Sequence, residues 1–256
     1  MNRVELRGVT QRFGDRTVLA DLDLDIRKGE VLGLLGQNGA GKTTTLRILC
    51  GLLQPTEGTV RVDGVDVRAD PVAARRRFAF VPDGAPLYAN LSPRQHLALV
   101  GRLHGVDEER IEREGRRLLE ALELGPRADD PVGTFSRGMR QKTALACALL
   151  PRPPLLILDE PLNGLDAPTT AVFKDVLRTW ADRGGSVLYT SHLLDVAERV
   201  CDRLAVLAQG KLVALGTLPE LRAQSGRDGT LEQVFGALTQ SADPHEQALR
   251  LLGDPA

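Results

Sequence analysis

A glycine-rich run between an apolar segment and a predicted helix is the first feature of this chain that could do chemistry. The aliphatic residues Val31 to Leu35 precede Gly36-Gln37-Asn38-Gly39-Ala40-Gly41-Lys42-Thr43. Glycines let successive backbone N–H groups turn inward around an anion, Lys42 supplies a positive charge for β- and γ-phosphates, and Thr43 offers a hydroxyl to Mg²⁺. The helix that follows adds its positive end. These residues, here called the phosphate loop, predict a nucleotide site rather than a chance glycine-rich turn.

Two carboxylates follow a second aliphatic run. Asp159 and Glu160 come directly after Leu155 to Leu158, and ligands of open α/β sheets bind at the carboxyl ends of strands. We therefore expect both carboxylates near the phosphates, with Asp159 holding Mg²⁺ through its water shell. Glu160 is then placed to polarise a water for attack on the γ-phosphorus. Without the phosphate loop, a catalytic pair and two solvated carboxylates at a strand end would be equally good interpretations of Asp159 and Glu160.

A third segment, Phe135 to Gln141, precedes an apolar helix. Ser136 stands in an N-cap position and Gly138 permits close approach of the backbone, which is the make-up of an anion site at a helix start. Taken alone, this segment favours an ordinary capped helix.

Apolar runs without alternation predict the core strands that position these residues. Such runs are typical of a parallel sheet with helices on both faces. The core strands predicted in this way are 31–35, 155–158 and 186–190. The helices predicted around them from three-and-four spacing are 42–52, 168–183 and 193–201. The fold class is therefore α/β, with a P-loop core and a mostly parallel sheet.

Other segments predict additions to this core. Period-two alternation in Asp21 to Ile26 and Thr59 to Val62, together with Val4 to Val9, predicts a small N-terminal antiparallel sheet. The aspartates of the first segment are expected to form a solvated face rather than a metal site. Between residues 86 and 150 the pattern turns helical and predicts an inserted helical subdomain. Its helices are expected at 94–104, 108–124 and 137–150.

A hairpin and a polar tail are predicted toward the end of the chain. A hairpin around Gln209-Gly210 leads to a polar tail that includes a short amphipathic stretch, Thr230 to Leu238. We expect a main domain over residues 1–218 and a C-terminal extension over 219–256.

Composition limits the choice of partners. The 256 residues carry 33 Lys and Arg against 34 Asp and Glu, a net charge of −1, so no polyanion-binding surface is indicated and no direct nucleic-acid partner is expected. The chain has an odd number of cysteines, Cys50, Cys147 and Cys201, and they are not spaced as metal ligands. This pattern is typical of a protein in a reducing compartment. The charged first residues do not resemble a signal peptide, and no window has eighteen apolar residues, so we expect a chain that is soluble by itself.

Taken together in their order, these motifs resemble the nucleotide-binding subunit of ATP-binding cassette (ABC) transporters. The resemblance runs from about Val4 to Leu218 and is carried by Gly36 to Thr43, Phe135 to Gln141, Leu155 to Pro161, Asn163-Gly164-Leu165-Asp166 and His192. It implies that two subunits enclose two ATP molecules head to tail, so that Ser136 acts across a dimer, either a homodimer or a heterodimer.

The resemblance also implies roles for single residues. Phe13 matches the aromatic that stacks on adenine, Asp166 the acid that contacts the partner subunit, and His192 the histidine that senses the γ-phosphate. Glu160, His192 and Lys42 are the expected catalytic residues. The residues expected to bind ATP are Phe13, Gly36, Asn38, Gly39, Ala40, Gly41, Lys42, Thr43, Thr44, Ser136, Gly138 and Asp166. The residues expected at the metal are Thr43, Asp159 and Asp83.

Three residues depart from the family pattern. Asp83 stands where the family usually has Gln or Glu, and its shorter side chain puts direct contact with the metal or the attacking water in doubt. Arg137 replaces the usual first glycine of the third motif, while Ser136 and Gly138 remain. Asn163 replaces a common serine before Gly164.

The function that the resemblance implies is ATP hydrolysis that powers transport through a separate membrane permease. The segment Leu87 to Pro93 lies where the family docks its permease, although a plain surface loop fits it equally well. The tail around Leu231 to Phe235 is similar to that of exporter-type, ABC-2-like systems. We expect a cytoplasmic protein on the inner face of the cell membrane, with ATP and Mg²⁺ as cofactors. The alternative is a soluble ABC-type ATPase in translation or DNA maintenance, or a P-loop kinase or GTPase.

Overall fold

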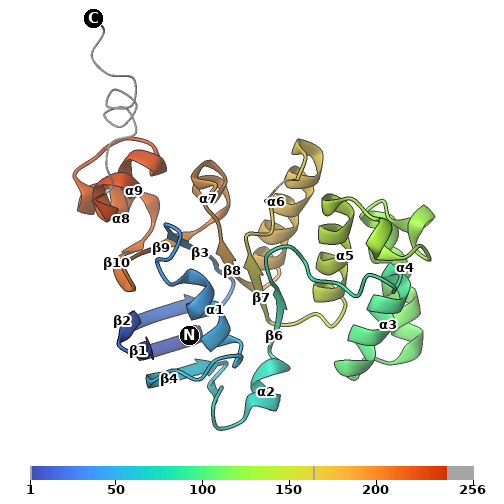
Figure 1. Cartoon of the computed structure of the whole chain (residues 1–256). Coiled ribbons are helices and arrows are strands. Elements are labelled where there is room, and N and C mark those ends of the chain that lie inside the picture. Colours follow the sequence, from blue (N-terminus) through green and yellow to red (C-terminus); the bar gives the residue numbers. More distant parts are fainter. Residues whose placement is uncertain (1, 164, 241–256) are drawn as a thin grey trace, which may run out of the picture.

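Two β-sheets and the helices around them make up the fold (Figure 1). The computed structural model describes residues 2–163 and 165–240. In Figure 1 the N-terminal strands lie next to α1, while α3, α4 and α5 are grouped at the opposite end of the molecule from α8 and α9. The central sheet connects these groups.

The central sheet has the strand order β10-β9-β3-β8-β7-β6. Its strands are β3 (Val31–Gly36), β6 (Phe78–Val81), β7 (Leu155–Asp159), β8 (Ser186–Thr190), β9 (Arg203–Ala208) and β10 (Lys211–Gly216). From β9 to β6 each strand runs parallel to its neighbour, while β10 pairs antiparallel with β9. The predicted α/β class with a mostly parallel sheet is confirmed.

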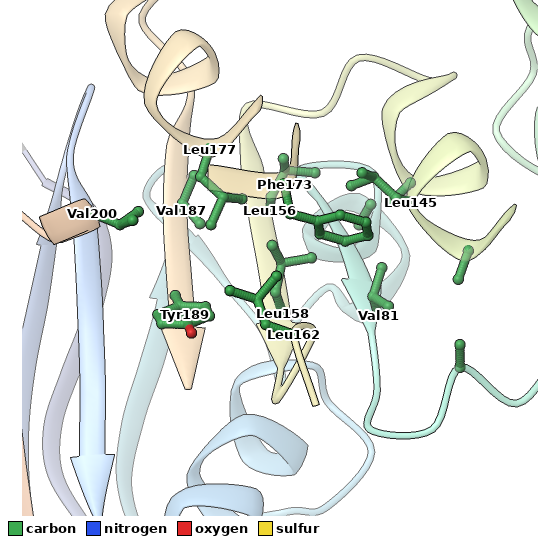
Figure 2. Close-up of a cluster of buried hydrophobic side chains, with 14 of the residues drawn as sticks. Val81, Leu145, Leu156, Leu158, Leu162, Phe173, Leu177, Val187, Tyr189 and Val200 are labelled. Carbon is green, nitrogen blue, oxygen red and sulfur yellow. The ribbon is translucent and has the colours of Figure 1, made fainter. Parts of the chain in front are cut away.

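The central strands are apolar throughout because both faces of the sheet are buried. Along β7, Leu155 and Ile157 belong to one hydrophobic cluster, which also holds residues of the helix α1 (Lys42–Leu49). Leu156 and Leu158 belong to a second cluster on the other face, together with Phe173 of α6 (Ala167–Asp182). Figure 2 shows this second cluster gathered around the ring of Phe173. Helices on both sides therefore hold the strand ends in fixed positions.

The N-terminal sheet is antiparallel, as predicted. Its order is β2-β1-β4-β5, formed by β1 (Asn2–Phe13), β2 (Arg16–Arg27), β4 (Glu57–Val62) and β5 (Val65–Asp66). The turn between the two long strands pairs Phe13 with Arg16. In the acidic alternation of β2, Asp23 accepts a hydrogen bond from the backbone N–H of Gly8 at 2.7 Å.

The inserted helical subdomain is confirmed. It contains α3 (Pro93–Leu103), α4 (Glu108–Ala121) and α5 (Arg137–Leu149), with short 3₁₀ helices at Gly125–Arg127 and Val132–Thr134. A capping box at Ser92 and Gln95 begins α3. The second helix ends three residues before the predicted Leu124, because Glu123 adopts a left-handed φ of 61° and the Gly125-Pro126 pair follows.

Two features of the central sheet were not predicted. The predicted hairpin is confirmed as β9 and β10, but its place in the central sheet, where β9 lies parallel to β3 with Leu34 opposite Ala205, was not predicted. The strand β6 was not predicted, since its four residues give too short a pattern between Arg77 and Pro82. Its register beside β7, with Val81 opposite Leu158, places the residues after both strands at one edge.

The remaining helices are short and lie at the periphery of the sheet. They are α2 (Pro71–Arg75), α7 (Leu194–Val200), α8 (Leu218–Ser225) and α9 (Leu231–Thr239). Leu221, Leu231 and Val234 are fully buried in the cluster that also holds Phe173, so the described part of the C-terminal segment packs on the core. Residues 241–256 of the predicted extension lie outside the described residues. No helix in the described part of the chain has the length and apolar content needed to span a membrane.

Candidate functional site: a phosphate loop facing two strand-end carboxylates

The phosphate loop connects β3 to α1 and is shaped by its glycines. Gly41 adopts a φ of 110°, and a Cβ there would meet Leu19 Cδ2 at 2.5 Å, so only glycine fits. Lys42 is the first residue of α1 and its side chain is buried. Its Nζ donates to the carbonyl oxygens of Gly36 at 2.6 Å and Gln37 at 3.4 Å. The ammonium group is therefore held within the loop itself.

A cleft of about 720 Å³ opens in front of this loop. Strands β1, β3, β6, β7 and β8 all deliver residues to it from their carboxyl ends or the loops that follow. Its lining consists of Phe13, Arg16, Val18, Gly36, Gln37, Asn38, Gly39, Gly41, Lys42, Thr43, Thr44, Asp83, Asp159, Glu160, Asn163 and His192. Residues that are up to 179 positions apart in sequence, from 13 to 192, thus share one cavity.

Asp159, the last residue of β7, is one of the few buried carboxylates of the described chain. Its Oδ1 accepts a hydrogen bond of 2.6 Å from the hydroxyl of Thr190 on β8. Burial is the main cause that raises the pKa of Asp159, the Thr190 hydrogen bond opposes it, and the nearby charge of Asp83 raises it further. A cation in the cleft would favour the ionised carboxylate.

Glu160 is paired with His192. The carboxylate Oε2 lies 2.9 Å from His192 Nδ1 and accepts a second hydrogen bond from the His192 backbone N–H at 3.2 Å. Glu160 also has a left-handed φ of 48°, which is unfavourable for a side chain of this size. Its backbone N–H donates to the Thr190 hydroxyl at 3.0 Å. The main chain is thus bent so that the Glu160 side chain leaves the strand end toward His192.

Thr190 was missed by the sequence prediction although it links the carboxylate of Asp159 to the backbone of Glu160. Its hydroxyl donates to Asp159 and accepts from the backbone of Glu160, and the residue is fully buried. A polar residue at the end of an otherwise apolar strand was the available signal. Arg16 was missed as well, since its approach to the cleft depends on the hairpin that pairs it with Phe13.

Four of the predicted ATP-binding residues do not line the cleft of this single chain. They are Ala40, Ser136, Gly138 and Asp166. Ala40 belongs to the loop itself and is buried. Ser136 and Asp166 are exposed and cap the helices α5 and α6, accepting from Met139 N at 3.2 Å and Thr169 N at 2.8 Å.

The segments around these caps lie close together. A Cβ at Gly138 would be 3.7 Å from Leu165 Cδ2, in ordinary contact. Gly164 of the fourth motif lies outside the described residues. Ser136 and Asp166, which are exposed, and the partly buried Gly138 therefore stand outside the cleft of this single chain.

A phosphate loop that faces strand-end carboxylates across a parallel sheet defines the P-loop class of nucleotide-binding proteins. Within that class, residues 19–163 match the family model described as ABC transporter. Over 96% of its length the chain is 34% identical to the whole of the ABC-type transporter ATP-binding protein EcsA of Bacillus subtilis. The chain belongs to the ABC transporter family of ATP-binding proteins.

Other relatives carry export or resistance names. The chain is 39% identical, over 88% of its length, to 71% of the daunorubicin resistance ATP-binding protein DrrA3 of Streptomyces coeruleorubidus. It is 35% identical, over 94% of its length, to the protein of Escherichia coli described as "Probable multidrug ABC transporter ATP-binding protein YbhF", and it spans 42% of that longer protein. The family prediction is confirmed, and these names favour transport over the alternative of translation or DNA maintenance.

Solved structures agree with this assignment. The structure of an ATP-binding subunit of an ABC transporter matches with a TM-score of 0.88 at 34% identity, over 92% of this chain and 99% of that one. The dimeric structure of a post-hydrolysis state of the ATP-binding cassette MJ0796, bound to ADP and Pi, matches with a TM-score of 0.77 at 26% identity. That match covers 84% of this chain and 98% of the other.

Proposed function

We propose that this chain hydrolyses ATP to ADP and phosphate and that the cycle of binding and hydrolysis drives export through a separate membrane protein. The observation that carries the proposal is the convergence of Lys42, Asp159 and the Glu160–His192 pair on one cleft. Hydrolysis needs charge compensation on the terminal phosphate and a base for the attacking water, and these side chains offer both. The direct test is phosphate release by the purified protein in the presence of MgATP.

Each side chain has a distinct part in the proposed reaction. Lys42 turns its ammonium group from the carbonyl oxygens of its own loop toward the β- and γ-phosphates. Glu160 accepts a proton from the water that attacks the γ-phosphorus. His192 orients the Glu160 carboxylate through the 2.9 Å contact and contacts the same phosphate.

The donor set of the cleft fits Mg²⁺. Thr43, Asp159 and Asp83 line it and offer hydroxyl and carboxylate oxygens, which this small hard cation prefers. Burial disfavours the ionised form of Asp159 and raises its pKa, and a cation bound beside this carboxylate would stabilise the ionised form. Bound there, the ion would offset the negative charge of the phosphates.

We propose that the active form is a dimer, either of two such chains or of this chain with a similar one. The exposed Ser136 and Asp166, with the partly buried Gly138, would then contact the nucleotide or the loops of the facing subunit. Support comes from the ion pair that joins Arg137, next to Ser136, to the cleft residue Asp83, and from the dimeric form of the related cassette MJ0796.

We expect Phe13 to form the adenine platform. The ring is 51% exposed at the rim of the cleft, so its removal costs the free protein little. Phe13→Ala is expected to weaken ATP binding by about 1–3 kcal/mol, as for base–aromatic stacking elsewhere. Equilibrium dialysis with ATP and with adenosine should show the same loss for both ligands.

Tyr88→Ala is the matched control for this variant, because Tyr88 is an exposed aromatic residue outside the cleft. An ATP affinity that is equal in Phe13→Ala and the wild type would exclude Phe13 from the site.

A second cavity, of about 520 Å³, is the place where we propose that the membrane permease docks. It lies between β6 and the helical subdomain and is mostly apolar. Its lining includes Val72, Phe78, Phe80, Leu87, Val100, Leu103, Ala144 and Cys147. Leu103 and Val72 are 78% and 60% exposed, which is an unusual degree of exposure for aliphatic side chains. A short permease helix held there would fix the chain at the cytoplasmic face of the membrane.

Leu103→Glu is expected to release the chain from its permease. A carboxylate in an apolar groove loses its hydration without gaining a partner, so co-purification from native membranes should fall at least about tenfold. ATP affinity should be unchanged, because Leu103 is absent from the cleft lining. Leu52→Glu, which alters a residue that is 64% exposed and outside the groove, is the control. Full co-purification of Leu103→Glu would place the permease on another surface.

A further inference from the structure

Asp83, which lines the cleft, forms an ion pair with Arg137 of the helical subdomain. Arg137 Nη2 lies 3.5 Å from Asp83 Oδ1. Asp83 belongs to the segment that follows β6, while Arg137 is the first residue of α5, directly after the cap Ser136. These are two of the positions at which the sequence departs from the family pattern, and neither departure was expected to involve the other.

The charge of Asp83 gives this pair a consequence for nucleotide binding. Asp83, Asp159 and Glu160 all line the cleft, so three carboxylates surround the place where phosphates would bind. The charge of Asp83 already contributes to the raised pKa of Asp159. A carboxylate left unpaired at position 83 would repel a polyphosphate that carries no Mg²⁺, and Arg137 supplies the positive charge that compensates it.

We propose that Arg137 is a positioning residue that acts through Asp83: it neutralises this carboxylate and ties the start of α5 to the phosphate side of the cleft. The two departures from the family pattern thus compensate each other. This inference rests on the proposed ATP site. It assigns to Arg137 a role within its own subunit, which is distinct from the contact proposed for Ser136 across the dimer.

The exposure of the pair suits a contact that opens and closes. The side chains of Arg137 and Asp83 are 47% and 55% exposed, so water and salt screen their attraction. Such a pair is weak enough to rearrange when phosphates enter the cleft. The start of α5 can then respond to the charge in the cleft without a large barrier.

The test compares the effect of Arg137→Gln in two backgrounds. With Asp83 present, Arg137→Gln leaves that carboxylate unpaired, and the Kd for ATP measured without Mg²⁺ is expected to rise about two- to fivefold at low salt, the range of an exposed ion pair. In the Asp83→Gln background the same substitution is expected to leave the Kd unchanged. Arg137→Lys, which keeps the charge, should restore wild-type affinity.

The same measurements at about 1 M salt should abolish the difference between the two backgrounds, because the screening length falls to about 3 Å. The matched control is the exposed pair Glu112–Arg116 on α4, with atoms 2.9 Å apart and outside the cleft. Arg116→Gln should leave the Kd unaltered whether residue 112 is Glu or Gln. Thermal unfolding of every variant separates these effects from a loss of folding.

An equal rise in Kd for Arg137→Gln in both backgrounds would overturn the inference, because Arg137 would then act on the nucleotide directly. No rise in either background would overturn it too. The Kd measurement needs no hydrolysis, so a wild-type protein that binds MgATP without releasing phosphate refutes the proposed function while these results still decide the role of Arg137.

Discussion

Replacing Glu160 with Gln is expected to lower kcat for ATP hydrolysis about a hundred- to ten-thousandfold, the usual contribution of a general base. The amide keeps the size of the side chain and its place next to His192 but cannot take up a proton at the operating pH. The affinity for ATP should stay close to that of the wild type. With binding intact and hydrolysis blocked, the variant should accumulate as the ATP-bound dimer in size-exclusion chromatography.

The control for this variant is Glu120→Gln, which makes the same chemical change at an exposed site on α4 and outside the cleft. It should retain wild-type kcat and should remain in the wild-type oligomeric state. If Glu160→Gln hydrolysed ATP at the wild-type rate, Glu160 could not be the base. A variant that stays monomeric with saturating ATP would instead contradict the proposed dimer.

The sequence was sufficient to predict the parts of the site that are local in the chain. The phosphate loop could be predicted because a strand, a glycine loop and a helix start follow one another within a few residues. Asp159 and Glu160 could be placed near it because parallel strands end at one edge of the sheet. Both inferences use short-range pattern and one general rule of sheet topology.

The parts that were missed depend on contacts between distant segments. The hydrogen bonds of the Thr190 hydroxyl to the Asp159 carboxylate and the Glu160 backbone require the register of β7 and β8, which pairs Asp159 with Thr190. The contact between Asp83 and Arg137 requires the helical subdomain to fold back on the loop after β6. No periodicity in either segment carries this information, because an ion pair between exposed residues leaves the local pattern unchanged.

The same difference between local pattern and long-range contact explains which features of the strands could be predicted. The hairpin of β9 and β10 was recognised from its turn, but its place in the central sheet was not, since strand order is a property of tertiary packing. Successive residues of β3 point to opposite faces of the sheet, and both faces are buried, since Val31 and Leu32 belong to different hydrophobic clusters. This explains why β3 has no polar face.

The second large effect is expected at Lys42. Lys42→Met keeps most of the buried aliphatic side chain and removes the ammonium group, so the change isolates the charge. Hydrogen bonds to a charged group contribute about 1.5–3 kcal/mol, and their loss corresponds to a Kd for ATP that is about ten to a hundred times higher. Because Lys42 is placed for the phosphates, the Kd for adenosine should not change.

This selectivity separates the two ends of the ligand. Phe13→Ala should weaken ATP and adenosine equally, while Lys42→Met should weaken ATP alone. The control is Arg47→Met on the same helix, where an exposed positive charge is removed outside the cleft. An equal loss of ATP affinity in Arg47→Met would mean that the general positive field of α1 attracts the phosphates. A loss confined to Lys42→Met would mean that one buried ammonium, held 2.6 Å from the Gly36 carbonyl oxygen before ligand arrives, makes the decisive contact.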